Sequence, residues 1–145
     1  MVVRSSALVM LLFAGCMVRP YEPFLVAPLH GLPVDAFARC CDLFVARQLP
    51  IIKADAGEFR LQTNWGPIER SSVMAQQRAT IFRTALGLGL IVEVRYLRQG
   101  WFATLPGWTE PRPDAALEHD LGDALIAALS AFVPVEVVAP GPSSR

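Results

Sequence analysis

The clearest pattern in the sequence is a strict alternation of side-chain types between residues 59 and 65. The positions on one face are Phe59, Leu61, Thr63 and Trp65, and those on the other are Arg60, Gln62 and Asn64. A period of two with a single apolar face is typical of a half-buried strand in an antiparallel hairpin. The segment therefore predicts a sheet with one covered face, and it predicts that Trp65 lies in the core.

Strand character is also present in four other segments, at residues 24–27, 52–54, 75–86 and 90–97. By spacing alone residues 75–86 fit a strand or a helix, and their β-branched and aromatic side chains favour the strand. Gly87 and Gly89 supply a hairpin turn before the last strand. The segments at residues 66–72 and 99–113 are expected to be loops.

Two segments have helical periodicity. The apolar positions in residues 34–48 are Phe37, Cys41, Phe44 and Val45. The apolar stripe in residues 114–132 consists of Leu117, Leu121, Ala124, Leu125, Ala128 and Phe132, with Glu118, Asp120 and Asp123 off it.

Helices and strands with one apolar face each fit a two-layer α+β domain. We expect an antiparallel sheet of about five strands packed by two helices on one face, in the order β-α-β-β-β-β-α. The 145 residues suit a single domain at residues 24–133 with a flexible tail at residues 134–145. The 53% of hydrophobic residues exclude a disordered chain. Thirteen basic and thirteen acidic residues, without a basic run, indicate no nucleic-acid partner.

The N-terminal residues have the parts of a secretory signal peptide: Arg4, an apolar run at residues 7–13, and small residues before Cys16. The run is shorter than the roughly 18–20 residues that cross a bilayer as a helix. The segment Phe13-Ala14-Gly15-Cys16 resembles the lipobox of bacterial lipoproteins, which implies cleavage between Gly15 and Cys16 and lipidation of the Cys16 thiol. An ordinary cleaved signal, in which Cys16 is incidental, is the alternative.

The lipobox resemblance implies a signal peptide at residues 1–15 and a lipid-anchored tether at residues 16–23. Met17 follows the cysteine at the position where Asp favours retention in the inner membrane, so the expected location is the outer membrane, facing the periplasm. Several acyl chains, at about 0.8 kcal/mol per buried methylene, would hold the protein there durably. The mean hydropathy of +0.40 therefore describes the leader as well as the domain.

The residues that could support catalysis or bind a metal are few and poorly spaced. His30 and His119 lie far apart, and neither a His-x-x-x-His nor a Cys-x-x-Cys spacing occurs. Cys40 and Cys41 are adjacent, which is too close for ordinary disulfide geometry. Cys41 lies on the apolar stripe and is expected in the core. We therefore expect no catalytic residue, no metal and no cofactor.

The loop at residues 100–108 is the best candidate for binding a partner, because exposed aromatic residues in long loops are typical of interaction sites. The residues concerned are Trp101, Phe102 and Trp108. The alternative is that these side chains extend and cap the core, where large aromatic residues usually lie.

A second resemblance concerns the domain itself. Residues 50–55 and 57–65 contain a hydrophobic pair, a short turn and a strand that ends in Thr-x-Trp. Across residues 24–132 the chain resembles the helix-grip domains of the C lipoprotein of the outer-membrane β-barrel assembly machinery. The resemblance implies a helix-grip fold on a lipidated N-terminus. The chain departs from that protein by having one such domain and by lacking its N-terminal partner-gripping segment.

Together these features predict a non-enzymatic envelope lipoprotein with an accessory or scaffold role in outer-membrane protein assembly or envelope organisation. Its partners would be the membrane, through the N-terminal lipid, and an envelope protein. The alternative is a carrier of a small hydrophobic ligand, in a helix-grip pocket lined by Phe59, Leu61, Val92 and Leu121.

Overall fold

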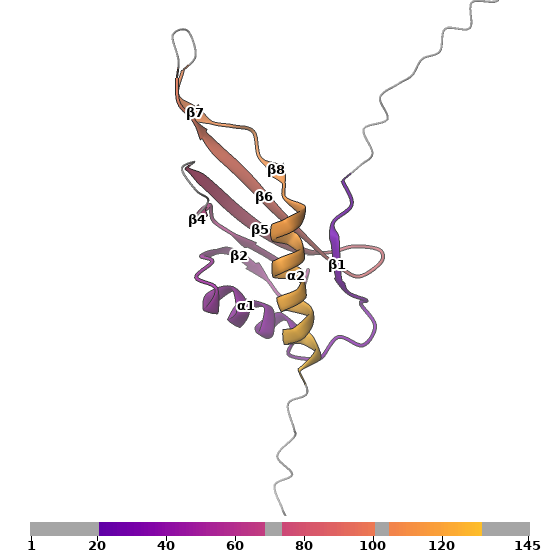
Figure 1. The fold of residues 1–145 in the computed structure, drawn as a ribbon. Coiled ribbons are helices and arrows are strands. Elements are labelled where there is room, and N and C mark those ends of the chain that lie inside the picture. The colour runs from indigo at the N-terminus through magenta and orange to yellow at the C-terminus, as the bar shows by residue number, and fades with distance from the viewer. Residues whose placement is uncertain (1–20, 69–73, 101–104, 132–145) are drawn as a thin grey trace, which may run out of the picture.

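The computed structural model describes residues 21–68, 74–100 and 105–131. Two helices and eight strands follow one another along these residues (Figure 1). In order they are β1 (Phe24–Ala27), α1 (Ala36–Ala46), β2 (Ile51–Asp55), β3 (Arg60–Thr63), β4 (Gly66–Ile68), β5 (Ala75–Arg83), β6 (Leu88–Arg98), β7 (Gly107–Trp108), β8 (Arg112–Pro113) and α2 (Ala115–Ser130). The prediction of an α+β fold with an antiparallel sheet and two helices is confirmed.

The sheet has eight strands rather than about five. Its main path is β1-β6-β5-β3-β2, while β4 pairs with β5, and both β7 and β8 pair with β6. The three additional strands lie in the segments that were expected to be loops, residues 66–72 and 99–113. Each has only two or three residues, which is too short to show an alternation in the sequence.

Both helices cover the same face of the sheet. Leu61, Ile81 and Leu90 stand opposite one another on β3, β5 and β6, and all three are fully buried. Cross-strand neighbours share a face. This row joins Phe44 of α1 and Leu125 of α2 in one core cluster, so it marks the covered face of the sheet. Helix α1 lies beside α2 on that face (Figure 1).

Helix α1 turns toward the core a stripe that overlaps the predicted one: Phe37, Cys41 and Phe44 contact the core, whereas Val45 does not. Ala36, Cys40 and Phe44 are buried at a regular spacing of four residues. Val45 is 68% exposed and Cys41 is only half-buried. The fully buried thiol is therefore that of Cys40, while Cys41, predicted in the core, packs against the edge of the core cluster.

Element boundaries differ from the prediction by a few residues. Helix α1 is shorter than the predicted residues 34–48, and Gln48, with a φ of +56°, lies outside the helical conformation. Strand β5 ends at Arg83 rather than at residue 86, because Thr84 begins a tight turn to β6.

Helix α2 is fixed to β6 through its first turn. Glu118, which the sequence placed off the apolar stripe, is 4% exposed, and its carboxylate accepts the Val92 N–H at 3.0 Å. The Asp114 N–H donates to the Val92 carbonyl at 2.8 Å. Strand β1 pairs with β6 as far as Leu90, and β8 pairs from Glu93 onward. Glu118 and the N-cap residue of α2, Asp114, therefore supply both hydrogen-bond partners at the position that the two strands leave open.

A close approach brings α2 against β1. A Cβ at Gly122 would clash with the ring of Phe24, so this helix position requires glycine. The ring of His119 packs edge-on against Phe24 with 5.0 Å between the centroids. The Tyr21 hydroxyl hydrogen-bonds to Glu118, and burial together with this carboxylate raises the pKa of Tyr21 above its ordinary value. The start of the described chain is thereby attached to α2.

Candidate functional site

The face of the sheet opposite the two described helices is the candidate interaction surface, and we call it the open face. Its side chains alternate with core positions along β2, β3, β5 and β6. They are Lys53, Asp55, Arg60, Gln62, Gln76, Arg78, Thr80, Phe82, Ile91, Glu93 and Arg95. This mixture of arginine, aromatic and aliphatic side chains is typical of protein interfaces.

A one-residue bulge places Trp65 on the open face, which overturns the prediction that it lies in the core. Leu61 pairs with Ile81, but Gly66 pairs with Gln77, so the chain between these pairs is one residue longer than the facing part of β5. An inserted residue reverses the side-chain alternation. The ring of Trp65 consequently lies against arginine side chains of the open face.

Four residues form a stack of indole rings and guanidinium groups, which we call the Trp–Arg stack. The guanidinium carbon of Arg95 lies 4.3 Å from the ring centroid of Trp65 and 4.7 Å from that of Trp108. The guanidinium carbon of Arg78 lies 4.6 Å from the centroid of Trp65. Each such contact contributes about 0.5–1 kcal/mol at exposed sites.

Polar side chains on the facing strand hold both arginines in position. Two nitrogens of Arg78 donate to one carboxylate oxygen of Glu93 at 2.6 and 2.9 Å. Two nitrogens of Arg95 donate to the side-chain oxygen of Gln76 at 2.6 and 2.9 Å. Both pairs are direct cross-strand neighbours of β5 and β6. The Trp–Arg stack is therefore ordered before any partner binds.

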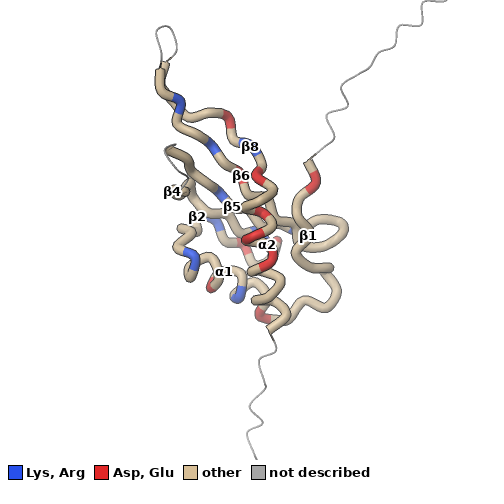
Figure 2. Tube along the Cα trace, viewed as in Figure 1, with Lys and Arg blue, Asp and Glu red and all other residues tan. Residues whose placement is uncertain are grey.

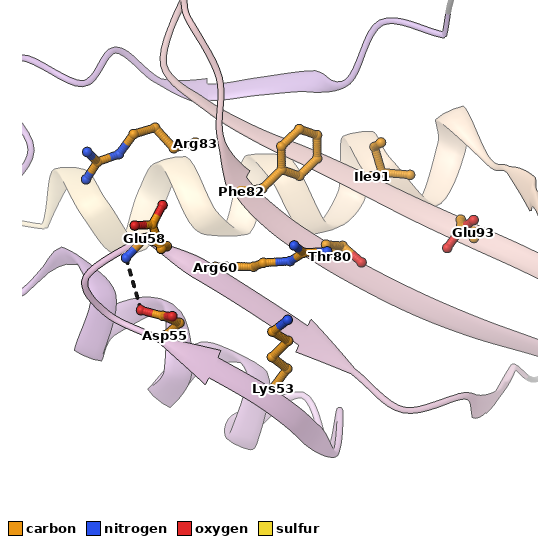
Figure 3. Close-up of a pocket in the computed structure, with 9 residues that line it drawn as sticks. All are labelled: Lys53, Asp55, Glu58, Arg60, Thr80, Phe82, Arg83, Ile91 and Glu93. Carbon is orange, nitrogen blue, oxygen red and sulfur yellow. Dashed lines mark hydrogen bonds between the residues drawn. The ribbon is translucent and has the colours of Figure 1, made fainter.

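The open face has a hollow (Figure 3), and one of its lining residues, Glu93, binds Arg78 of the Trp–Arg stack. The hollow has a volume of about 550 Å³ and is lined by Lys53, Asp55, Glu58, Arg60, Thr80, Phe82, Arg83, Ile91 and Glu93. Phe82 and Ile91 give it an apolar part. Lys53, Arg60 and Arg83 make no ion pair with another described residue. Asp55 and Glu58, which also line the hollow, make no ion pair with a described residue either, so the hollow suits a partly apolar partner group that pairs with charges of both signs.

Charge is distributed unevenly between the sheet and the helix that covers it (Figure 2). Strands β5 and β6 contain four arginines and one glutamate, whereas α2 contains three acidic residues and neither Lys nor Arg. These strands are therefore more basic than α2, and their basic side chains lie mainly on or beside the open face.

Among the lipidation and partner-binding residues predicted from the sequence, Trp108 is the one that lies in the described part of the chain. Gly15, Cys16, Trp101 and Phe102 lie outside the described residues. Trp108 belongs to β7, is half-buried, and takes part in the Trp–Arg stack.

Sequence reasoning did not single out Arg78 or Arg95. A hairpin that turns at residues 84–87 brings Gln76 opposite Arg95, and Arg78 opposite Glu93. The signal for the two arginines is that each has a complementary side chain at its paired position. This signal can be recognised only when the register of the hairpin is known.

The residues that the carrier hypothesis assigned to a ligand pocket lie in the packed core. Phe59, Leu61, Val92 and Leu121 are between 0% and 7% exposed and belong to one hydrophobic cluster. They do not line the hollow described above. The packing of the interior therefore gives an internal carrier pocket no support.

The described residues contain no group of three or more side chains that could hold a metal ion. His30 and His119 are both exposed, and they belong to different parts of the fold. Burial raises the pKa of the Cys40 thiol to about 12, so Cys40 is a neutral core residue at physiological pH. Neither helix of the described ranges has the length and apolar character of a membrane span.

Comparison with known proteins identifies no family: no protein-family model matches the chain, and no curated protein does. Function has therefore to be inferred from the open face and from the N-terminal sequence.

Proposed function

We propose that the protein is a non-enzymatic envelope lipoprotein, anchored through Cys16, whose domain binds another envelope protein through the open face. Its role would be that of an accessory or scaffold in outer-membrane protein assembly or envelope organisation. The observation that carries the binding part of this proposal is the ordered Trp–Arg stack beside a hollow, on the face opposite the two described helices. Trp and Arg are among the residues most enriched at the energetic centres of protein interfaces.

The open face has four basic side chains and two acidic ones, so its net charge favours an acidic segment of the partner. Lys53 and Arg60 line the hollow without an ion pair to another described residue. Carboxylates of a partner would complement these cations, which increases the rate and the specificity of association. Phe82 and Ile91 would meanwhile receive an apolar side chain of the same segment.

The proposed location rests on the N-terminal sequence, where the apolar run, the small residues and Cys16 form the lipobox pattern. The proposed assembly role rests on the resemblance to helix-grip domains. The packing of both helices against one face of an antiparallel sheet supports this resemblance at the level of fold. Fold similarity does not itself specify a role, so the partner has to be found by experiment.

Metabolic labelling with palmitate tests the anchor. The wild-type protein is expected to take up the label and to fractionate with the outer membrane. The variant Cys16→Ala is expected to lose the label, whereas the control Cys41→Ala should keep it. A label that persists on Cys16→Ala would refute the lipid anchor.

Site-specific photo-crosslinking in cells tests the binding face. A photoreactive residue replaces Arg60 in the hollow or, as a control, Val45 on α1; both positions are exposed. We expect a light-dependent adduct with an outer-membrane protein from position 60 and none from position 45. Equal yields at both positions, or none at position 60, would contradict binding through the open face.

A further inference from the structure

One end of the open face is apolar, and its most exposed apolar residues take no part in the proposed protein contact. Tyr21, Leu25 and Leu86 are 43%, 48% and 79% exposed there. They lie around a second hollow of about 620 Å³, which shares Phe82 and Ile91 with the first. Large apolar side chains that cluster at a surface mark an interaction site, unlike apolar residues that are scattered singly.

The turn that carries Leu86 is firmly built. The Thr84 N–H donates to the Gly87 carbonyl at 2.7 Å, and the Thr84 hydroxyl accepts the N–H groups of Leu86 and Gly87 at 3.2 and 3.1 Å. A Cβ at Gly87 would clash with the carbonyl oxygen of Ala27, so the turn packs directly on β1. Leu86 is therefore held in solvent by a turn with satisfied backbone groups.

The apolar end of the domain is also the end closest to the proposed anchor. Tyr21 is the first described residue, it lines the second hollow, and it is hydrogen-bonded to Glu118. Tyr21 is five positions after Cys16 in the sequence. A chain of that length spans at most about 18 Å when fully extended. A lipid on Cys16 would therefore keep this end of the domain near the bilayer surface.

We propose that Tyr21, Leu25 and Leu86 dock on the bilayer that holds the anchor, a docking that rests on the lipidation of Cys16 in the proposed function. The two leucines enter the boundary between headgroups and acyl chains, where tyrosine is also favoured. Arg83 precedes the turn, has no ion pair with a described residue, and reaches the lipid phosphates.

This docking orients the domain. The β5–β6 turn lies at one end of β6, beside β1, and β7 lies at the other end (Figure 1). Trp108 of β7 belongs to the Trp–Arg stack. With the turn on the bilayer, the stack is held away from the membrane, in a position where a protein can reach it.

The test uses the mature full-length lipoprotein in vesicles of phosphatidylcholine and phosphatidylglycerol that contain nitroxide-labelled acyl chains. A fluorophore is attached at Leu86→Cys or, as a control, at Leu105→Cys, which replaces another exposed leucine beyond the far end of β6. Both variants also carry Cys40→Ala and Cys41→Ala. When vesicles are added, we expect the fluorescence emission of the probe at position 86 to shift to shorter wavelengths and to be quenched at least about twofold. The emission of the probe at position 105 should change in neither way.

A second measurement avoids the cysteine substitutions, in case they prevent folding. Hydrogen exchange of the turn at residues 84–87 is compared with and without vesicles, in the wild-type protein and in Leu86→Asp. Vesicles should slow exchange in the wild type at least about threefold and should leave the exchange of Leu86→Asp unchanged.

Quenching at position 86 that does not exceed quenching at position 105 overturns the proposal. A blue shift without quenching also overturns it. Because only the vesicle lipids carry nitroxide, the hollow would then hold an acyl chain of the protein itself. The intact mass of the protein, measured first, separates the hypothesis of the lipid anchor from the hypothesis of bilayer docking. A mass without acyl chains refutes the anchor and the docking with it, whereas an acylated protein without quenching refutes the docking alone.

Discussion

The two faces of the sheet hold their side chains in place by different interactions. On the covered face, Phe44 and Leu61 are fully buried and are fixed by packing within one apolar cluster. On the open face, Arg78 and Arg95 remain half-exposed and are fixed by cross-strand hydrogen bonds and indole rings. Burial of apolar surface contributes about 25 cal/mol per Å² to the free energy of folding. A fully buried side chain therefore contributes much more than one partly solvated polar contact.

This difference separates stability from binding. The covered face supplies most of the free energy of folding, so substitutions there act on the whole domain. The open face is ordered but contributes little, so its residues can be exchanged while the fold is retained. Measurements of unfolding free energy at matched positions of the two faces can therefore test the division directly.

The largest effect is expected for Phe44→Ala on the covered face. The substitution removes a fully buried ring and leaves a cavity, so it should lower the free energy of unfolding by about 3–5 kcal/mol. Urea denaturation measures the loss. Val45→Ala, at the adjacent exposed position, should change stability by no more than about 0.5 kcal/mol. Similar losses at both positions would contradict the orientation of α1.

The next effect concerns Glu118, a polar residue of the covered side. Glu118→Ala leaves the buried Val92 N–H without an acceptor and should cost about 1–3 kcal/mol in unfolding free energy. Glu118→Gln, which keeps an acceptor oxygen, should cost less. The control Asp120→Ala breaks an exposed ion pair with Arg47 and should cost at most about 1 kcal/mol. Equal losses in Glu118→Ala and Asp120→Ala would refute the role of Glu118.

A smaller effect is expected on the open face. Trp65→Ala removes two cation–π contacts and should cost about 1–2 kcal/mol, well below the cost of deleting a core ring. A double-mutant cycle with Arg95→Ala, measured by urea denaturation, should give a coupling of about 0.5–1 kcal/mol. A cost as large as that of Phe44→Ala would place Trp65 in the core and refute the bulge.

The smallest effect is an alkaline loss of stability that depends on Cys40. Burial raises the pKa of this thiol to about 12 in the folded protein, from an ordinary value near 9. Because the thiol ionises more readily in the unfolded chain, a rise in pH favours unfolding. The contribution of Cys40 to the free energy of unfolding is therefore complete below pH 9 and is lost as the pH rises from 9 to 12, with about 1 kcal/mol lost at pH 10. Unfolding free energies measured between pH 7 and 10 should decline less steeply for Cys40→Ala than for the wild type. Cys41→Ala should keep most of the decline, and parallel curves for the wild type and Cys40→Ala would contradict the burial of Cys40.

The fold class could be predicted because its signals are local. The alternation of β3 and β6 and the apolar stripes of the two helices repeat within a few residues, and each pattern indicates its own element. The short strands β4, β7 and β8 carry no such repeat, since they form only where a longer strand offers unpaired backbone groups.

The errors at single residues arose where a distant contact decides the outcome. Glu118 is polar and was expected in solvent, but the backbone of Val92, which comes 26 residues earlier in the chain, supplies its partner. Trp65 follows the alternation in the sequence, and one additional residue in the pairing with β5 reverses its side. Of the candidate site, the sequence therefore anticipated Trp108, while Arg78 and Arg95 depended on hairpin register.

The attachment of α2 to Val92 also affects how the domain opens. Both backbone hydrogen-bonding groups of this residue are bound by the N-cap and the first turn of the helix. The Val92 amide proton is consequently protected from exchange with water while α2 is docked on the sheet. The exchange rate of one amide would thus report the undocking of a sixteen-residue helix, which joins the C-terminal part of the domain and β6 in a single cooperative unit.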